Sequence, residues 1–500
     1  MARKVVVVGG GVGGLATALE LRRHGYDVTV CERHTEIGGK ASQRVEAGFR
    51  WDEGPSIIVL NWVYRELFKA SGLDPDAYLT MRRLDPAFRV VLSDGTAIDV
   101  PAGEAGLASA FGAIEPADGE GLHRFMKRVD KFARRLGHSY CDRIIDGWSK
   151  VFFSRLMLSA ATISPNLGYA ALLDQYFRSP RVHELLYGFP TFSGFEPRTA
   201  PASLAIIPWT IIREGVWYPV GGVHAIPLAI ARACRERGVD IQTQTDVERI
   251  ELDSTGQVRG VATSAGFIDA KIIVSNCDLV PTYQMLHGGR GFTPEVEALR
   301  AEDADPAVSF FTLQLGCNRT WPNLKHHLLV LTKGSEHVYQ ELFVRKEYPA
   351  DPPIYVNTTS DTDPQDAIPG GCNPFIVISV PALDPAHPLP ADFQERFAEK
   401  ILNRLEEAGL PGLRESIQTM TITGPADWQK KFLSFRGSIY GLSPKHNVLQ
   451  GSFRPINYRP DIPGLYLVGG SVQPGPGLPM VVQGGKITAA RIARDFPAGR

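Results

Sequence analysis

A glycine-rich turn near the start of the chain is the first feature whose spacing carries chemistry. Residues 9–14 have the pattern G-x-G-x-x-G and follow the apolar run over residues 4–8. In such a turn the first glycine permits the sharp bend, the second lets a pyrophosphate approach the backbone, and the third lets helix and strand pack closely. The free N–H groups at the start of the following helix would hold the phosphates. We therefore expect a dinucleotide to contact Gly9, Gly11, Val12, Gly13 and Gly14.

An acidic residue at the end of the next predicted strand supports the same site. The turn leads into an apolar-periodic helix, and a second strand over residues 27–31 ends at Glu32, which lies 18 residues after Gly14. A carboxylate in this position accepts hydrogen bonds from the ribose hydroxyls. Its charge would repel a 2′-phosphate, so a nucleotide without that phosphate is expected.

Two segments at and after Glu32 resemble those of flavoproteins. Residues 32–40 read E-R-H-T-E-I-G-G-K, which is similar to the E-x(5)-GG-[RK] extension of the glutathione-reductase-like flavoproteins. In that superfamily these glycines and the basic residue wrap the FAD pyrophosphate from the other side. Residues 49–56 read F-R-W-D-E-G-P-S and resemble the F-x-D-x-G-P-[ST] segment of carotenoid desaturases, which runs beside the isoalloxazine ring. The resemblance implies FAD as the cofactor, with contacts at Arg33, Gly39, Lys40, Gly54, Pro55 and Ser56.

The C-terminal region resembles the phytoene-desaturase family. Residues 464–470 are expected to form a buried strand that ends in glycine, followed by a Pro- and Gly-rich loop and a helix over residues 481–495. The family pattern is L-Y-L-V-G-[AG]-x-x-x-P-G-x-G-[VIL]-P. Residues 214–222 also resemble its G-V-[WY]-[YF]-P-x-G-G segment, so the similarity covers nearly the whole chain. It implies further FAD contacts at Val247, whose backbone would hold the adenine, and at Gly470, Ser471, Gly477, Leu478, Pro479 and Met480.

The chain is therefore identified as a member of the phytoene-desaturase-type carotenoid desaturases. This implies FAD-dependent desaturation of a linear polyene such as phytoene or diapophytoene, by hydride transfer to flavin N5, with oxygen or a quinone as terminal electron acceptor. The form of residues 477–480 is equally similar to that of enzymes acting on modified carotenoids. A desaturase or oxidase of the diapolycopene or methoxyneurosporene type is therefore the alternative.

Other functions on the same scaffold give different expectations. A flavin amine oxidase usually carries an acid just after the last strand, where this chain has Gly470 and Ser471. A protein similar to the GDP-dissociation inhibitors of small GTPases would share the fold, bind prenylated proteins and hold no flavin. Saturases, isomerases and oxygenase-like relatives share the flavin site, so these motifs do not separate them.

The organisation along the chain predicts an α/β fold in three interleaved parts. A Rossmann-like FAD-binding domain of glutathione-reductase type is expected from residues 1–75, 215–290 and 420–500. An antiparallel-sheet substrate domain is expected from residues 76–104 and 291–419; it includes a hairpin over residues 89–100 with Asp94-Gly95 as its turn. Residues 105–214 are expected to form a helical lid or membrane-facing subdomain, with an ordinary solvent-facing helical subdomain as the alternative.

A catalytic base is not required by the expected chemistry. Loss of hydride from a polyene leaves a delocalised cation, so orientation and water exclusion matter most, and neither a triad nor a metal is expected. The resemblance nevertheless points to one helix, where some family members place an acid and a base, and so to Arg181, His183 and Glu184. The alternative is a solvated helix start, with Ser179 as cap and Pro180 in the first turn.

Aromatic and aliphatic side chains are expected to form the tunnel for the polyene. Core packing is the alternative for most of them. The aromatic candidates are Phe152, Phe153, Tyr169, Tyr176, Phe177, Tyr187, Phe189, Phe192, Phe195, Trp209, Trp217 and Tyr218.

Composition limits the partners and the location. A net charge of −1 gives no bulk attraction to nucleic acid. The six cysteines show no C-x-x-C or metal-ligand spacing, which is typical of reduced thiols in a cytoplasmic protein. No run reaches the roughly 18 apolar residues of a spanning helix, and the apolar stretches at 151–158 and 202–212 are interrupted. A water-insoluble substrate then implies peripheral association with a membrane surface. The oligomeric state stays open.

Overall fold

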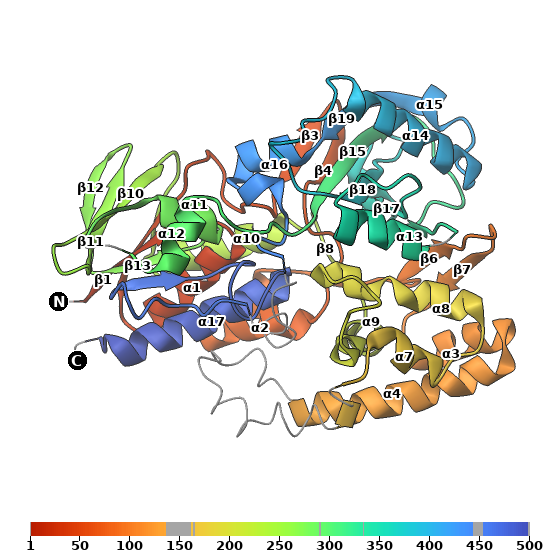
Figure 1. The fold of residues 1–500 in the computed structure, drawn as a ribbon, viewed down its shortest axis with the longest axis horizontal. Coiled ribbons are helices and arrows are strands. Elements are labelled where there is room, and N and C mark those ends of the chain that lie inside the picture. Colours follow the sequence, from red (N-terminus) through yellow and green to blue (C-terminus); the bar gives the residue numbers. More distant parts are fainter. Residues whose placement is uncertain are drawn as a thin grey trace.

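The chain folds into two lobes that meet in the middle of the molecule (Figure 1). The computed structural model describes residues 2–136, 162–163, 166–289, 292–333, 335–443 and 454–498. Both chain ends lie in one lobe, and the other lobe holds a second sheet with a group of helices beneath it (Figure 1). The apolar stretch at 151–158, including Phe152 and Phe153, lies outside the described residues.

The first lobe is built on a five-stranded parallel sheet with the order β20-β13-β1-β2-β9. Its strands are β1 (Lys4–Val8), β2 (Asp27–Cys31), β9 (Asp240–Gln242), β13 (Ile272–Ser275) and β20 (Leu465–Leu467). The predicted strands at 4–8 and 27–31 are confirmed. Both faces of the sheet are covered, which explains the uninterrupted apolar run in β1. Strands from the beginning, middle and end of the chain therefore lie side by side.

Helices cover one face of this sheet and a smaller sheet covers the other. The helices are α1 (Val12–Arg23), α2 (Asn61–Ala70), α10 (Ala225–Glu236) and α17 (Leu478–Asp495). The smaller sheet consists of β10 (Val247–Leu252), β11 (Val258–Thr263), β12 (Gly266–Asp269) and β14 (Leu286–Gly288), with α11 (Leu279–Gln284) and α12 (Pro294–Arg300) beside it. Helix α17 starts at residue 478, three residues before the predicted start. A side chain at Gly485 would lie 2.8 Å from the Thr17 backbone nitrogen, so this glycine allows α17 to approach α1 closely.

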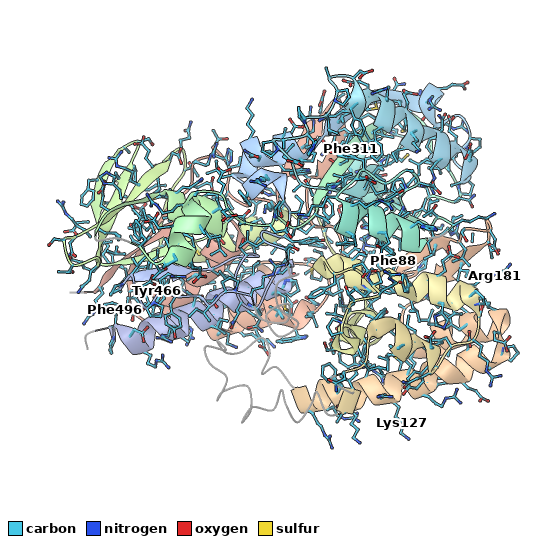
Figure 2. The ribbon with its side chains drawn as sticks, in the orientation of Figure 1. Phe88, Lys127, Arg181, Phe311, Tyr466 and Phe496 are labelled. Atoms are coloured by element: carbon cyan, nitrogen blue, oxygen red, sulfur yellow. The ribbon has the colours of Figure 1, made fainter. Side chains whose placement is uncertain are left out.

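The second lobe is built on a seven-stranded sheet with the order β19-β15-β18-β17-β16-β6-β7. Its strands are β6 (Phe88–Val91), β7 (Ala97–Val100), β15 (Ser309–Cys317), β16 (His327–Val330), β17 (Ile354–Asn357), β18 (Phe375–Val380) and β19 (Ile417–Thr423). The predicted hairpin is confirmed, since Phe88 pairs with Val100. The expectation of an antiparallel sheet is correct except between β16 and β6, which run parallel. Helix α14 (Phe393–Glu407) packs on this sheet, and Phe311 lies in the core between them (Figure 2).

Two segments cross the limits that the sequence predicted between domains. Strand β19 pairs along its length with β15, although residues 420–423 were assigned to the cofactor domain. The hairpin of β3 (Gln43–Glu46) and β4 (Phe49–Asp52) lies within the predicted range 1–75 but packs on the second sheet. There the Trp51 indole N–H donates to the Leu315 carbonyl at 3.1 Å. These segments connect the two lobes.

The described part of residues 105–214 is mostly helical, as predicted, and this helical group lies under the second sheet (Figure 1). It contains α3 (Glu104–Ile114), α4 (Pro116–Leu136), α7 (Tyr169–Asp174), α8 (Pro180–Tyr187) and α9 (Ile206–Glu214). Figure 2 shows Lys127 pointing outward from α4. Among the described residues, no helix is long and apolar enough to cross a bilayer. The remaining short elements are β5 (Met81–Arg83), β8 (Trp217–Pro219), α13 (Ser335–Tyr339), α15 (Leu413–Ser416) and α16 (Pro425–Phe432).

Candidate cofactor and substrate site

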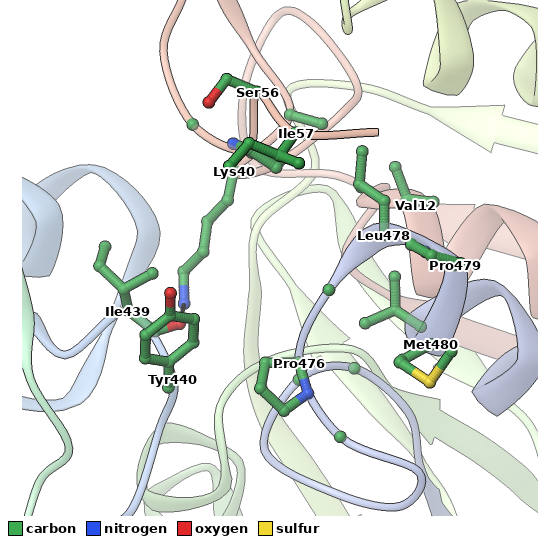
Figure 3. Close-up of a pocket in the computed structure, with 18 of the residues that line it drawn as sticks. Val12, Lys40, Ser56, Ile57, Ile439, Tyr440, Pro476, Leu478, Pro479 and Met480 are labelled. Carbon is green, nitrogen blue, oxygen red and sulfur yellow. Dashed lines mark hydrogen bonds between the residues drawn. The ribbon is translucent and has the colours of Figure 1, made fainter. Parts of the chain in front are cut away.

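One large cavity runs between the two lobes. Its volume is about 1010 Å³, at the upper end of the range for a single small-molecule site, which is roughly 300–1,000 Å³. Its wall begins at the glycine turn after β1, continues along the loop before α17, and ends between the second sheet and the helical group. Figure 3 shows Val12 from one end of the chain beside Leu478, Pro479 and Met480 from the other. The cavity therefore joins segments from both ends of the chain to the second lobe.

The glycine turn leaves room for phosphates because no side chain fits there. Gly9 has a φ of +97°, a backbone conformation that would be strained in a residue with a side chain. A Cβ on Gly14 would lie 2.2 Å from the Gly9 carbonyl oxygen, so this glycine is needed for helix–strand packing, as predicted. A Cβ on Gly11 would lie 2.7 Å from the Asn276 amide nitrogen. The bare backbone at the start of α1 therefore fits a pyrophosphate.

Glu32 is held in place before any nucleotide arrives. The side chain is buried at the end of β2, and one carboxylate oxygen accepts from the Gly10 N–H at 2.8 Å. The other oxygen accepts from the His34 N–H at 2.9 Å. The carboxylate borders the same cavity as Val247, the residue expected at the adenine. This arrangement fits the predicted ribose contact.

The sequence analysis missed a polar segment that follows β13. Asn276 lies against the glycine turn, and its side-chain oxygen would be 2.7 Å from a Cβ on Gly13. Strand β13 pairs with β1 in parallel, so both strands end at the edge of the sheet where ligands bind in such folds. The available signal was the apolar run over residues 272–274, followed directly by Ser275 and Asn276.

Lys40 and Asp278 form an ion pair at the cavity wall. Their charged atoms lie 3.6 Å apart, and Lys40 also donates to the Ile439 carbonyl at 3.3 Å, toward which it reaches in Figure 3. Asp278 accepts a hydrogen bond from the Ser471 hydroxyl at 2.7 Å. An acid that follows the neighbouring strand β13 thus contacts the segment after the last strand, where the sequence itself has none. A Cβ on Gly54 would lie 1.9 Å from the Lys40 carbonyl oxygen, so these two segments touch closely.

Most of the predicted cofactor residues border the cavity. Two do not: Gly14 serves packing, and Ser471 lies behind Asp278. The predicted residues in the wall are Gly9, Gly11, Val12, Gly13, Glu32, Arg33, Gly39, Lys40, Gly54, Pro55, Ser56, Val247, Gly470, Gly477, Leu478, Pro479 and Met480.

The far part of the cavity is a mainly apolar chamber. Its walls come from the second sheet, the helical group and the segment after Ser56, and include Ile57, Ile207, Leu329, Phe375 and Val377. Of the aromatic candidates whose side chains the structure describes, three border the chamber: Phe189, Phe195 and Trp209. Three others are buried in the core instead, as the packing alternative predicted: Tyr169, Phe177 and Tyr218.

The three candidate catalytic residues on α8 are not brought together in the cavity. Arg181 pairs with Asp94 at 2.6 Å on the outside of the molecule, where Figure 2 shows it. The His183 ring nitrogen Nε2 lies 3.1 Å from the Phe177 carbonyl and is absent from the cavity wall. Glu184 borders the cavity, but its carboxylate accepts from both the N–H and the hydroxyl of Ser93.

The start of the helix that carries these residues has the cap that the alternative interpretation predicted. The Ser179 hydroxyl oxygen accepts from the Arg181 N–H at 3.2 Å, and Pro180 occupies the first turn. Among the described residues, no cluster of histidine, cysteine or acidic side chains could hold a metal.

The comparisons with known proteins agree with this geometry. The family model described as flavin containing amine oxidoreductase matches residues 12–493. The chain is 32% identical to a 4,4′-diaponeurosporene oxygenase of Staphylococcus aureus (strain bovine RF122 / ET3-1), over 98% of each chain. The fold is similar to that of an oxidoreductase from Methanosarcina mazei, at 17% identity with a TM-score of 0.62, covering 98% of this chain and all of that one. It is also similar to cyclohexylamine oxidase from Brevibacterium oxydans IH-35A, at 18% identity with a TM-score of 0.59, covering 99% and 100%. The chain belongs to the family of flavin containing amine oxidoreductases, and its cofactor is FAD.

Proposed function

We propose that this enzyme oxidises a linear polyene of the carotenoid class at one end of its chain, in a reaction of the 4,4′-diaponeurosporene oxygenase type. The observation that carries the proposal is the continuity of one cavity from the glycine turn to an apolar chamber. A long hydrocarbon is held by shape and apolar contact, which this chamber offers. The full-length similarity to the staphylococcal relatives supports the same substrate class.

Each part of the cavity has a separate task in this proposal. FAD, when bound, supplies the electron acceptor. Glu32 and the turn at residues 9–14 hold the nucleotide end of the cofactor, while the loop before α17 closes over its other end. The apolar walls orient the polyene and exclude water, which shields the reacting carbons and favours one bond over its neighbours.

Desaturation of a linear precursor such as phytoene or diapophytoene is the second candidate. It is supported by the loop over residues 474–479, whose P-G-P-G-L-P sequence resembles the desaturase pattern. Both reactions would use the same cavity, so they differ in which carbon of the polyene is presented. Under either reaction we expect reversible binding to a membrane surface, where such a substrate dissolves, and oxygen or a quinone as the final acceptor.

Product analysis with purified FAD-loaded protein separates these reactions. The substrates are 4,4′-diaponeurosporene, diapophytoene and phytoene, each supplied in lipid vesicles under air, with mass and absorption spectra of the products as readouts. Gain of oxygen by 4,4′-diaponeurosporene supports the first proposal, and loss of hydrogen pairs from a precursor supports the second. Turnover of cyclohexylamine with none of the polyenes would contradict both. The matched control is a FAD-free Gly11→Val variant.

A further inference from the structure

A chain of buried hydrogen bonds leads from the substrate chamber into the second sheet. The Ser56 hydroxyl oxygen lies 2.8 Å from the Tyr355 hydroxyl oxygen, and both residues border the cavity. The Tyr355 hydroxyl in turn lies 2.8 Å from Nδ1 of His327, which is only 1% exposed. Tyr355 pairs across the sheet with Leu329 and Val377, two apolar chamber residues. This polar chain therefore opens into a mainly apolar wall.

The position of the ring proton on His327 decides which atom donates in each hydrogen bond of this chain. The Asn357 amide nitrogen donates to the His326 carbonyl at 3.2 Å, which fixes the orientation of that amide. The same nitrogen lies 3.4 Å from Nδ1 of His327. An amide nitrogen has no lone pair to offer, so we assign Nδ1 as the acceptor and place the ring proton on Nε2, which has no hydrogen-bond partner among the described residues. Burial holds the pKa of His327 well below its usual range, so the ring stays neutral.

The positions of the Tyr355 and Ser56 hydroxyl protons follow because each hydroxyl group has only one proton to donate. A tyrosine hydroxyl has one proton, and Tyr355 gives it to Nδ1 of His327. Burial raises the pKa of Tyr355, so this proton stays in place near neutral pH. Ser56 must then donate its single proton to the Tyr355 oxygen. The two hydroxyl groups consequently have only lone pairs left for a molecule in the chamber.

We propose that Ser56 and Tyr355 form an acceptor-only contact that selects polyenes carrying a hydroxyl group over those carrying a carbonyl. A hydroxyl would donate to a free lone pair, whereas a carbonyl oxygen has no proton and would face lone pairs directly. This inference rests on the proposed function and names its preferred ligand, a polyene alcohol. An oxidised carbonyl end would bind less tightly than the alcohol and so leave the site more readily.

The test compares three polyenes of equal chain length that end in a methyl, a hydroxyl or an aldehyde group. Their dissociation constants are measured with FAD-loaded protein in detergent micelles, from the change in polyene absorption. We expect the alcohol to bind about tenfold more tightly than the aldehyde, which corresponds to one hydrogen bond gained against one unpaired acceptor. The methyl-ended polyene serves as the measure of the apolar chamber itself.

Two variants distinguish this role from a merely structural one. Ser56→Ala should retain a preference for the alcohol, because the Tyr355 hydroxyl still donates to His327 and keeps only lone pairs for a ligand. Tyr355→Phe should improve aldehyde binding, because Ser56 then has a free proton to donate. The matched control is Gln418→Ala, which alters an exposed residue of β19 outside the cavity wall and should keep the wild-type ratio. Flavin absorption verifies that each variant retains its fold.

The possible results distinguish a failure of the acceptor-only contact from a failure of the proposed polyene oxidation. Equal binding of alcohol and aldehyde by the wild type would overturn the acceptor-only contact and leave polyene oxidation in place. An unchanged preference in Tyr355→Phe would overturn it as well. Failure to bind all three polyenes would contradict both the inference and the proposed function.

Discussion

The two ends of the cavity hold their ligands by different physical means. At the cofactor end, backbone N–H groups and the fixed carboxylate of Glu32 surround space that no side chain can enter. At the substrate end, apolar side chains from distant segments form a chamber with few polar groups. Removing one partner of a hydrogen bond to a charged ligand removes that whole interaction. A single substitution in an apolar wall removes only part of the apolar contact with the ligand. Single substitutions should therefore act most strongly at the cofactor end.

The largest effect is expected from Gly11→Val at the cofactor end. Its Cβ would lie 2.7 Å from the Asn276 amide, and the branched side chain would occupy the phosphate space. We expect FAD binding to weaken by about 3 kcal/mol or more, because overpacking and lost phosphate contacts add. Flavin absorption after gel filtration measures this. Gly112→Ala in α3 is the control, since a Cβ there meets only Gly119, at 3.9 Å. A Gly11→Val protein that stays fully yellow would rule out this phosphate site.

Glu32→Ala should have the second largest effect. Removal of the carboxylate leaves the Gly10 and His34 N–H groups and the ribose hydroxyls without their acceptor. We expect FAD binding to weaken by about 1–3 kcal/mol, measured by titration of the apoprotein. Glu36→Ala is the control, because Glu36 is an exposed residue of the same segment. An unchanged dissociation constant would show that Glu32 does not bind the ribose.

The buried histidines behind the substrate chamber should make the fold sensitive to acid. Burial lowers the pKa of His326 from 6.5 to about 3. Between these values the unfolded chain binds a proton that the folded chain does not, so stability falls as the pH decreases below 6.5. The free energy of unfolding should drop by up to about 1.4 kcal/mol per pH unit for this one group. Urea unfolding at pH 7, 6 and 5 measures the slope, which His326→Gln should reduce and the exposed His387→Gln should leave unchanged.

The smallest effect is expected from His183→Ala, outside both ends of the cavity. The ring contacts the Phe177 carbonyl and does not border the cavity. Turnover should fall by a factor of about ten or less, below the 10²–10⁴ typical of a positioned acid or base. The neighbouring Arg181→Ala serves as the comparison. A thousandfold loss with FAD still bound would instead identify His183 as a catalytic base.

The cofactor end could be predicted from the sequence because its chemistry depends on local backbone geometry. Gly9 and Gly14 are required by a turn whose residues are neighbours in the chain, and Glu32 follows at a fixed spacing. Asn276 and Asp278 were missed because the parallel pairing of β13 with β1, which brings them to the turn, joins residues far apart in sequence.

The substrate end could not be predicted residue by residue for the same reason. Tyr355 and His327 come from adjacent strands of the second sheet, and Ser56 comes from the segment after β4, so only the tertiary fold places them together. Composition indicated an aromatic and aliphatic tunnel but not which aromatic residues face it. At α8, the capping pattern of Ser179 and Pro180 was the correct local signal.

Anaerobic single-turnover reduction of the flavin by a polyene tests most directly whether the two ends of the cavity work together. FAD-loaded protein is mixed with 4,4′-diaponeurosporene, and loss of the oxidised-flavin absorption is followed in time. We expect the polyene to bleach the flavin in the wild type, and Val377→Trp to slow this by about tenfold while FAD stays bound, because the larger side chain fills part of the chamber. Bleaching that is equally fast in Val377→Trp, or no bleaching by any polyene in the wild type, would contradict a shared cavity for cofactor and substrate.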